Sequence, residues 1–270
     1  MKAFNRKFYN RFYNLVESCV TLGRPCIVHG SRGSGKTYLL TDLRPNWKCK
    51  ESIKSQESIL YFQVPLMENP VSVFRSLVAQ IAPDMPKISR ASEVRVYFET
   101  ALIASTIRLI IIDNAESAKS ELYRLIWASL ERVRANKHPV GLVLSCSEDR
   151  DLLSSLPDIA AKLPILGSFH MDALDAPNCL QALAHWAPAF KPLEYAIFGE
   201  DQDCEAFKSA DYLASVIRRL TGGAMLELSD LAMYWKQKSP KRVPDIGGIE
   251  EIWTMRGRIF PLLPKENFTA

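Results

Sequence analysis

The sequence predicts an α/β fold in which a parallel five-stranded sheet is flanked by helices and followed by a small C-terminal helical domain. Two patterns predict it. Short apolar segments alternate with helical ones from about residue 25 to residue 172, and strand signals then stop while helical periodicity continues. The length of 270 residues is enough for a core domain and a smaller second domain.

Five segments carry the strand signal, at residues 26–30, 59–64, 108–113, 140–145 and 164–171. Runs such as "RLIIID" and "VGLVLS" are typical of strands buried on both faces of a parallel sheet. Helices are expected after the first strand through about residue 43, and at residues 70–82, 91–106, 118–135, 175–188, 206–220 and 222–237.

The domain organisation follows from these segments. Residues 1–24 are expected to form an N-terminal amphipathic helix, residues 25–172 an α/β core domain, residues 173–238 a helical domain, and residues 239–270 a loop and tail. The first helix either packs on the core or contacts a partner or a neighbouring subunit. The apolar tail is a candidate docking segment, and in that case Trp253 is exposed in the free protein.

Composition and charge are those of a globular protein, with 47% hydrophobic and 24% charged residues. The net charge of +4 permits contact with nucleic acid without requiring it. Neither a signal peptide nor a run of about 20 apolar residues is recognised, so a cytoplasmic protein without a membrane partner is expected. The six cysteines show no metal-ligand spacing, so reduced buried thiols are expected.

Residues 30–37, "GSRGSGKT", match the phosphate-loop pattern G-x-x-x-x-G-K-[ST] between a strand and a helix. Glycines let the backbone curl so that its N–H groups face a phosphate at a helix N-terminus. In this pattern the lysine reaches the β- and γ-phosphates and the following hydroxyl ligates Mg²⁺. The predicted ATP-binding residues are Gly30, Ser31, Arg32, Gly33, Ser34, Gly35, Lys36 and Thr37.

Asp113 ends the third strand segment, "LIIID", and is predicted to join Thr37 on the metal side of the nucleotide. We expect its strand to neighbour the strand that feeds the phosphate loop. A carboxylate that only caps its strand is the alternative interpretation.

The position after Asp113 usually holds a glutamate that activates water, and here it is Asn114. An amide can hydrogen-bond a water molecule but cannot take its proton. Glu116 either orients that water or is an ordinary acid at a helix N-terminus, and the second interpretation is favoured. Slow hydrolysis is therefore expected, because the loss of an acid–base group typically costs about 10²- to 10⁴-fold in rate.

Features beyond the phosphate loop are similar to those of AAA+ ATPases. The fourth strand segment ends in "LSCSED", where Ser145 or Ser147 takes the place of a γ-phosphate sensor or caps the next helix. The helical domain contains a glycine pair, Gly222 and Gly223, and Met225 stands where an arginine is common in that family.

The chain over residues 3–237 resembles the TniB/TnsC-type AAA+ proteins, which are ATP-dependent regulators of DNA transposition distantly similar to MuB. The resemblance rests on the short N-terminal helix, the phosphate loop, "IIID-x-A-E" and "TGG". It implies ATP-dependent assembly on double-stranded DNA as filaments or rings, with the protein bridging a target selector and a transposase.

The same resemblance implies further site residues. An arginine finger from a neighbouring subunit precedes the fifth strand in this family, and the matching segment offers Lys162, with Arg150 slightly upstream. DNA contacts are expected after the second strand and at the helix start that follows. These segments offer Lys87, Ser89 and Arg90, which are alternatively solvated surface residues.

Two other classes of function remain open at this point. One is another AAA+ or STAND-type P-loop ATPase, for example an origin-recognition or clamp-loader type. The other is an assembly scaffold that binds ATP without cleaving it, which the substitutions at Asn114, Lys162 and Met225 favour.

Overall fold

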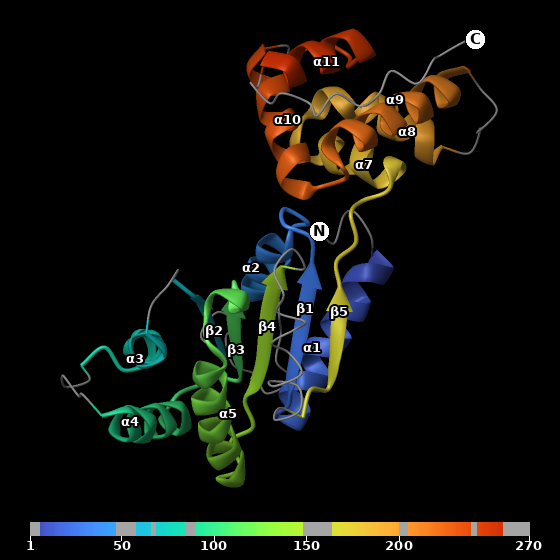
Figure 1. Cartoon of the computed structure of the whole chain (residues 1–270). Coiled ribbons are helices and arrows are strands. Elements are labelled where there is room, and N and C mark those ends of the chain that lie inside the picture. Colours follow the sequence, from blue (N-terminus) through green and yellow to red (C-terminus); the bar gives the residue numbers. More distant parts are fainter. Residues whose placement is uncertain are drawn as a thin grey trace. The chain divides into compact units, whose positions relative to one another are not determined.

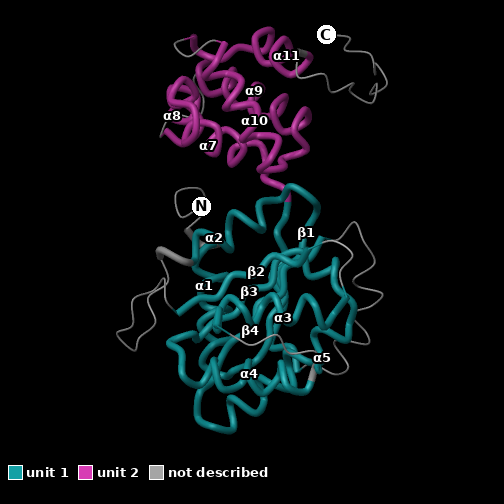
Figure 2. Tube along the Cα trace, turned by 90° about the vertical axis from the view of Figure 1, so that its left-hand side faces the viewer, with its two compact units in different colours: residues 1–172 teal, residues 173–270 magenta. Residues whose placement is uncertain are grey.

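The computed structural model describes residues 6–46, 58–65, 69–84, 90–147, 164–199, 205–238 and 242–255. The chain divides into two compact units, Met1–Asp172 and Ala173–Ala270 (Figure 2). Four of the residues considered for the site, Lys87, Ser89, Arg150 and Lys162, lie outside the described residues.

Unit 1 contains a parallel five-stranded sheet of order β2-β3-β4-β1-β5 (Figure 1). The predicted α/β sheet is therefore confirmed. The strand bounds are β1 Pro25–Gly30, β2 Ile59–Gln63, β3 Leu109–Asp113, β4 Gly141–Ser147 and β5 Gly167–His170.

The order of the strands corrects one expectation. β4 lies between β1 and β3, so the strand of Asp113 does not neighbour the strand that feeds the phosphate loop. Apolar runs identify strands but carry no information on which strands pair. Because all five strands are parallel, their carboxyl ends still open at one edge of the sheet.

Helices cover both faces of the sheet because side chains alternate along each strand. Ile110 and Ile112 of β3 pack in the core with helices α3, α4 and α5. Leu109 and Ile111 point to the opposite face, where they pack with helices α1 and α2. The helix bounds are α1 Arg6–Leu22, α2 Lys36–Asn46, α3 Pro70–Ile81, α4 Ala91–Ala104 and α5 Ser120–Ala135.

Helix α1 packs on the sheet as part of the core of unit 1. Tyr9, Phe12, Val16 and Cys19 form its buried stripe. The ring of Phe12 lies 5.2 Å from that of Phe169 in β5, measured between centroids. The sequence left open packing on the core or contact with a partner or neighbouring subunit, and the described residues of this helix pack on the core.

Unit 2 is helical. Its helices are α7 Ala176–Trp186, α8 Lys191–Phe198, α9 Glu205–Thr221, α10 Met225–Lys238 and α11 Ile246–Met255, with a short 3-10 turn, η3, at Pro188–Phe190. Three helices were expected here, and α8 and α11 were not. α8 has only eight residues and a proline at its start, and two glycines, Gly247 and Gly248, open α11 and weaken its helical signal.

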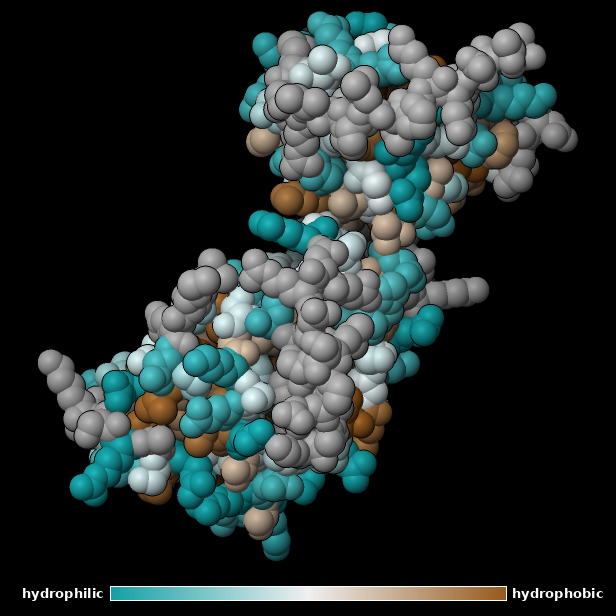
Figure 3. Space-filling model, in the orientation of Figure 1, coloured by the Kyte–Doolittle hydropathy of each residue, from teal (hydrophilic) through white to brown (hydrophobic). Residues whose placement is uncertain are grey.

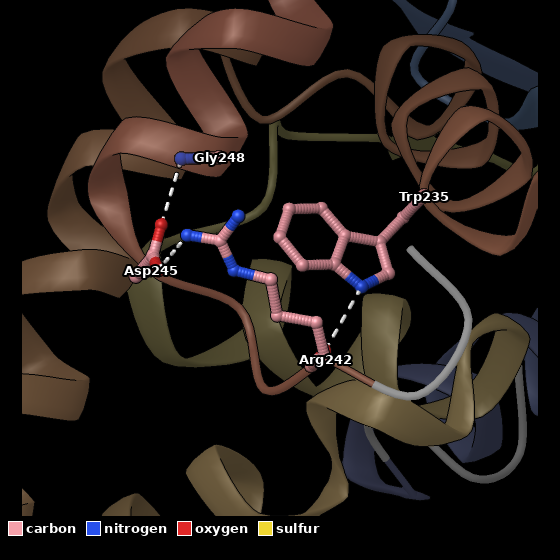
Figure 4. A network of polar contacts seen from close by, with 4 residues as sticks. All are labelled: Trp235, Arg242, Asp245 and Gly248. Carbon is pink, nitrogen blue, oxygen red and sulfur yellow. Dashed lines mark hydrogen bonds and ion pairs between the residues drawn. The ribbon is translucent and has the colours of Figure 1, made fainter. Parts of the chain in front are cut away.

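Helix α11 begins at a side-chain cap (Figure 4). Oδ1 of Asp245 accepts a hydrogen bond from the Gly248 backbone N–H at 2.7 Å, and Oδ2 pairs with Arg242. The indole Nε1 of Trp235 in α10 donates to the Arg242 carbonyl at 3.3 Å. The cap and the indole thus hold α11 beside α10.

This arrangement corrects the expected exposure of Trp253. Trp253 is only 3% exposed, and Ile249 and Ile252 are buried with it. A partner therefore cannot be detected by the burial of an exposed Trp253, because Ile249, Ile252 and Trp253 already pack within unit 2. Residues 256–270 of the expected tail lie outside the described residues.

None of the helices in the described part of the chain combines the length and apolar character needed to cross a membrane. On the face shown in Figure 3, apolar residues lie in small groups among hydrophilic ones. Scattered apolar residues of this kind are normal on a protein surface.

Candidate nucleotide-binding site

The phosphate loop connects β1 to the first residue of α2, Lys36. Gly33 and Gly35 have φ angles of 80° and 95°, in the left-handed region that favours glycine. Gly30 has φ 155°, and a Cβ there would lie 2.5 Å from the Met171 carbonyl oxygen. The glycines of the motif therefore stand where the curl of the loop and its contact with the end of β5 exclude a side chain.

The Lys36 ammonium lies within this curl. Its Nζ donates to the carbonyl oxygens of Gly30 and Ser31, both at 2.8 Å, and to Oγ of Ser34 at 3.4 Å. Ser34 is 3% exposed, whereas Arg32 at the outside of the loop is exposed. The loop thus gathers a cation and backbone groups at the N-terminal end of α2, where an anion is favoured.

Asp113 joins this loop to the end of β3. Its carboxylate is buried, with the residue 1% exposed, and Oδ2 accepts a hydrogen bond from the Thr37 hydroxyl at 2.7 Å. Oδ1 accepts from the Asn114 backbone N–H at 3.0 Å. The structure therefore brings together the two predicted metal-side residues from separate elements.

Tyr61 is a third residue at this carboxylate, and sequence reasoning missed it. Its hydroxyl, on β2, donates to the same Oδ2 of Asp113 at 2.6 Å. Burial is the largest cause that raises the pKa of Tyr61, followed by the hydrogen bond and the negative charge of Asp113. The phenol therefore stays protonated and acts as a donor at neutral pH. Only the pairing of β2 with β3 could have revealed it, since Gln63 lies opposite Asp113.

Asn114 adopts a left-handed conformation, with φ 55° and ψ 43°. Asparagine tolerates this region better than most residues. The chain then forms a 3-10 turn, η2, at Ala115–Ser117. The backbone thus turns sharply at the position where a water-activating glutamate is usual.

Glu116 lies in that turn, beside Tyr123 of α5. Burial, and then the Glu116 charge, raise the pKa of Tyr123, whose hydroxyl donates to the Ala115 carbonyl. Among the described residues, Oε2 of Glu116 is buried without a hydrogen-bond partner. Tyr123 packs with Ile110 and Ile112, on the face of the sheet opposite the Thr37–Asp113 contact.

The two serines at the end of β4 lie at different depths. Ser147 pairs with Gly30, the first residue of the phosphate loop, and its side chain is partly exposed. Ser145 is fully buried two residues earlier, and its Oγ has no hydrogen-bond partner among the described residues. The register thus puts Ser147 at the edge where the loop begins.

Met225 and Arg90, two further expected residues, and Arg218 lie in or directly before other helices. Met225 is 4% exposed at the start of α10, inside unit 2. The side chain of Arg218 in α9 lies close to Gly223. Burial raises the pKa of the Cys179 thiol to about 12, and the positive charge of Arg218 acts in the opposite direction. Arg90 is exposed and pairs with Glu93 at 3.9 Å.

The side chains at this edge suit a magnesium nucleotide. Mg²⁺ prefers hard oxygen ligands such as hydroxyl, carboxylate and phosphate oxygens. Thr37 and Asp113 supply the first two, and the Thr37 residue remains exposed at the end of its helix. The curled loop and Lys36 supply the groups that hold phosphates.

The sheet order, the phosphate loop after β1 and the buried carboxylate at the end of β3 define a P-loop fold of the AAA+ type. Residues 21–153 match the family model described as AAA domain. No curated protein sequence matches the chain.

Solved structures show the same fold. The ORC2 protein of Aeropyrum pernix, as ADPNP–ADP complexes, is 14% identical with a TM-score of 0.58, over 94% of this chain and 71% of that chain. A RuvB variant of Thermotoga maritima is 12% identical with a TM-score of 0.52, over 93% and 69%. Drosophila ORC bound to DNA is 12% identical with a TM-score of 0.54, over 94% and 61%.

Proposed function

We propose that this protein binds ATP with Mg²⁺ and uses ATP occupancy to assemble on double-stranded DNA. The observation that carries the proposal is the contact between Thr37 at the end of the phosphate loop and the buried carboxylate of Asp113. Lys36 and the loop would hold the phosphates, while Thr37 and Asp113 would hold the metal ion, which supplies charge neutralisation at the phosphates.

Hydrolysis is proposed to be slow. Asn114 replaces the usual glutamate, and its left-handed backbone makes this position a poor one for a longer side chain. The place of Glu116 beside Tyr123 supports its role as an ordinary acid of this turn rather than as a replacement base. Within the described residues, the site thus keeps groups that bind nucleotide, while an amide stands where the water-activating carboxylate is usual.

The proposed biological role is regulation of DNA transposition, by bridging a target selector and a transposase as a filament or ring on DNA. The resemblance to TniB/TnsC-type proteins supports this role. One structure of similar fold was solved with ADPNP and ADP, and another was solved bound to DNA. The mild positive charge of the chain is compatible with contacts to the DNA backbone.

The test is electron microscopy of the full chain with duplex DNA, with and without a non-hydrolysable ATP analogue. Nucleotide-dependent filaments or rings are expected for the wild type. Lys36→Ala should abolish them, since it removes the cation of the phosphate loop. Lys208→Ala removes one exposed charge from α9 in unit 2 and is the matched control. Absence of any assembly on DNA with the analogue would rule out this role.

A scaffold that binds ATP without cleaving it is the second candidate, and Asn114 favours it. Such a protein would form the same oligomer with ATP and with its non-hydrolysable analogue, and the oligomer would not require DNA. Sizing by light scattering without DNA separates the two functions.

A further inference from the structure

We propose that Tyr61 is a positioning residue for the metal-side carboxylate, holding Asp113 in the orientation that Mg²⁺ requires. This inference rests on the proposed nucleotide site and adds a residue to it. No phosphate-loop motif contains the position, because Tyr61 reaches the site from β2.

The geometry fixes Asp113 from three directions. Two hydroxyls, from Thr37 in α2 and Tyr61 in β2, donate to Oδ2 at 2.7 and 2.6 Å. The Asn114 N–H donates to Oδ1 at 3.0 Å. The residue after β2 also holds the backbone of Asp113, since the Val64 N–H donates to the Asp113 carbonyl at 3.0 Å. Donors on both oxygens restrict both side-chain torsions of the carboxylate.

The direction of these hydrogen bonds leaves oxygen lone pairs of Thr37 and Asp113 available to a metal ion or its water ligands. The Thr37 proton points to Asp113, so the lone pairs of that hydroxyl remain for the metal ion. An ionised carboxylate has about four acceptor sites, and donors in the described part of the chain use three of them. The remaining site suits a water ligand of Mg²⁺, which commonly keeps several waters in proteins.

A purely structural role for Tyr61 makes a different prediction. The Tyr61 ring packs against the core on the α1 and α2 face of the sheet, and Phe would keep this packing. A structural role would therefore alter folding or nucleotide binding in general. A positioning role alters only the part of the affinity that depends on the metal ion.

The experiment measures binding of a fluorescent ATP analogue to the full chain, first in EDTA and then in rising MgCl₂. For Tyr61→Phe, we expect an unchanged Kd in EDTA and a loss on the order of 10-fold in the tightening by Mg²⁺, as for other partners of metal-site groups. Tyr9→Phe is the matched control, because the Tyr9 hydroxyl is also buried and faces a carboxylate, Asp42, away from the site.

A double-mutant cycle separates positioning from packing. In the Asp113→Asn background, Tyr61→Phe should cause no further loss of the Mg²⁺ effect. Equal losses in EDTA and in Mg²⁺, or a Mg²⁺ effect as large as that of the wild type, would overturn the positioning role. Thermal unfolding of each variant shows whether it is folded. If the wild type binds no nucleotide, the proposed function itself is wrong, and this result is distinct from both others.

Discussion

The hydroxyl of Thr37 lies 2.7 Å from Oδ2 of Asp113, although 76 positions separate the two residues in the chain. The contact joins the first turn of α2 to the end of β3, past the intervening strand β4. It links a phosphate-binding loop to a buried carboxylate and so defines where a metal ion would sit. The next residue, Asn114, therefore lies beside the proposed metal site, at the position where a glutamate usually activates the attacking water.

Asn114→Glu is expected to accelerate ATP hydrolysis by about 10-fold, less than the 10²- to 10⁴-fold typical of a well-placed acid–base group. A base is restored, but a glutamate in the left-handed region at φ 55° carries strain of about 1–2 kcal/mol. Single-turnover hydrolysis at saturating Mg²⁺ and ATP measures the rate.

Asn114→Gln is the control for this variant, because it has the same length and the same backbone strain without a carboxylate. It should leave the rate unchanged. Equal acceleration by both variants would show that the shape of the turn, rather than a missing base, limits hydrolysis. A large loss of turnover in Glu116→Gln would instead make Glu116 the base, contrary to its place beside Tyr123.

The sequence predicts the sheet and the phosphate loop well because their signals are local. The apolar runs mark all five strands, and "GSRGSGKT" marks the loop between a strand and a helix. The pairing of strands depends on contacts that are distant in sequence. For this reason the position of β4 between β1 and β3 could not be predicted. The contact of Tyr61 with Asp113 could not be predicted either, because it depends on the pairing of β2 with β3.

Helix α11 was not predicted, although the residues that stabilise its start and its packing are close together in the sequence. Gly247 and Gly248 have low helix propensity, so the segment resembles a loop. Asp245 is a good N-terminal capping residue directly before it, and Ile249, Ile252 and Trp253 follow at helical spacing. The cap and the periodic apolar residues together outweigh the glycines once α10 provides a surface for packing.

The glycine pair after α9 allows a matched test of stability. Gly222 and Gly223 both have positive φ angles, 63° and 71°, so alanine at either position carries about 1–2 kcal/mol of strain. A Cβ at Gly222 meets nothing within 4 Å, whereas one at Gly223 meets the backbone of Leu174. Gly223→Ala should therefore lower the free energy of unfolding by about 1–3 kcal/mol more than Gly222→Ala. Urea denaturation followed by circular dichroism measures both, and equal losses would contradict the close contact.

The cap of α11 makes part of the stability depend on pH. The backbone N–H of Gly248 is the largest cause that lowers the pKa of Asp245 below its ordinary value of 3.8, followed by Arg242. Because the folded pKa is the lower one, this stabilisation is complete above 3.8 and is lost as the pH falls through the folded value. Urea denaturation between pH 6 and pH 2 should show this loss in the wild type.

Two aspartate variants isolate the contribution of the cap. Asp245→Asn should show a smaller decrease in stability over the acidic range, because its side chain does not titrate. Asp211→Asn, at an exposed position in α9, should retain the wild-type decrease. Identical pH profiles for all three proteins would mean that the Asp245 contact with Gly248 does not contribute to folding.

The exposed cation at the start of α4 gives the last test of the DNA proposal. The Arg90 side chain is 80% exposed, and its pair with Glu93 at 3.9 Å is too exposed to restrain it strongly. If Lys87 and Arg90 contact phosphates, Lys87→Ala with Arg90→Ala should weaken DNA binding equally for all sequences and reduce the salt slope by about two. Fluorescence anisotropy with duplex DNA over a range of salt measures both quantities. Lys208→Ala with Lys236→Ala, at exposed positions in α9 and α10, removes the same two charges and controls for net charge. An unchanged slope in the double variant would remove both residues from the interface and require a different surface for DNA.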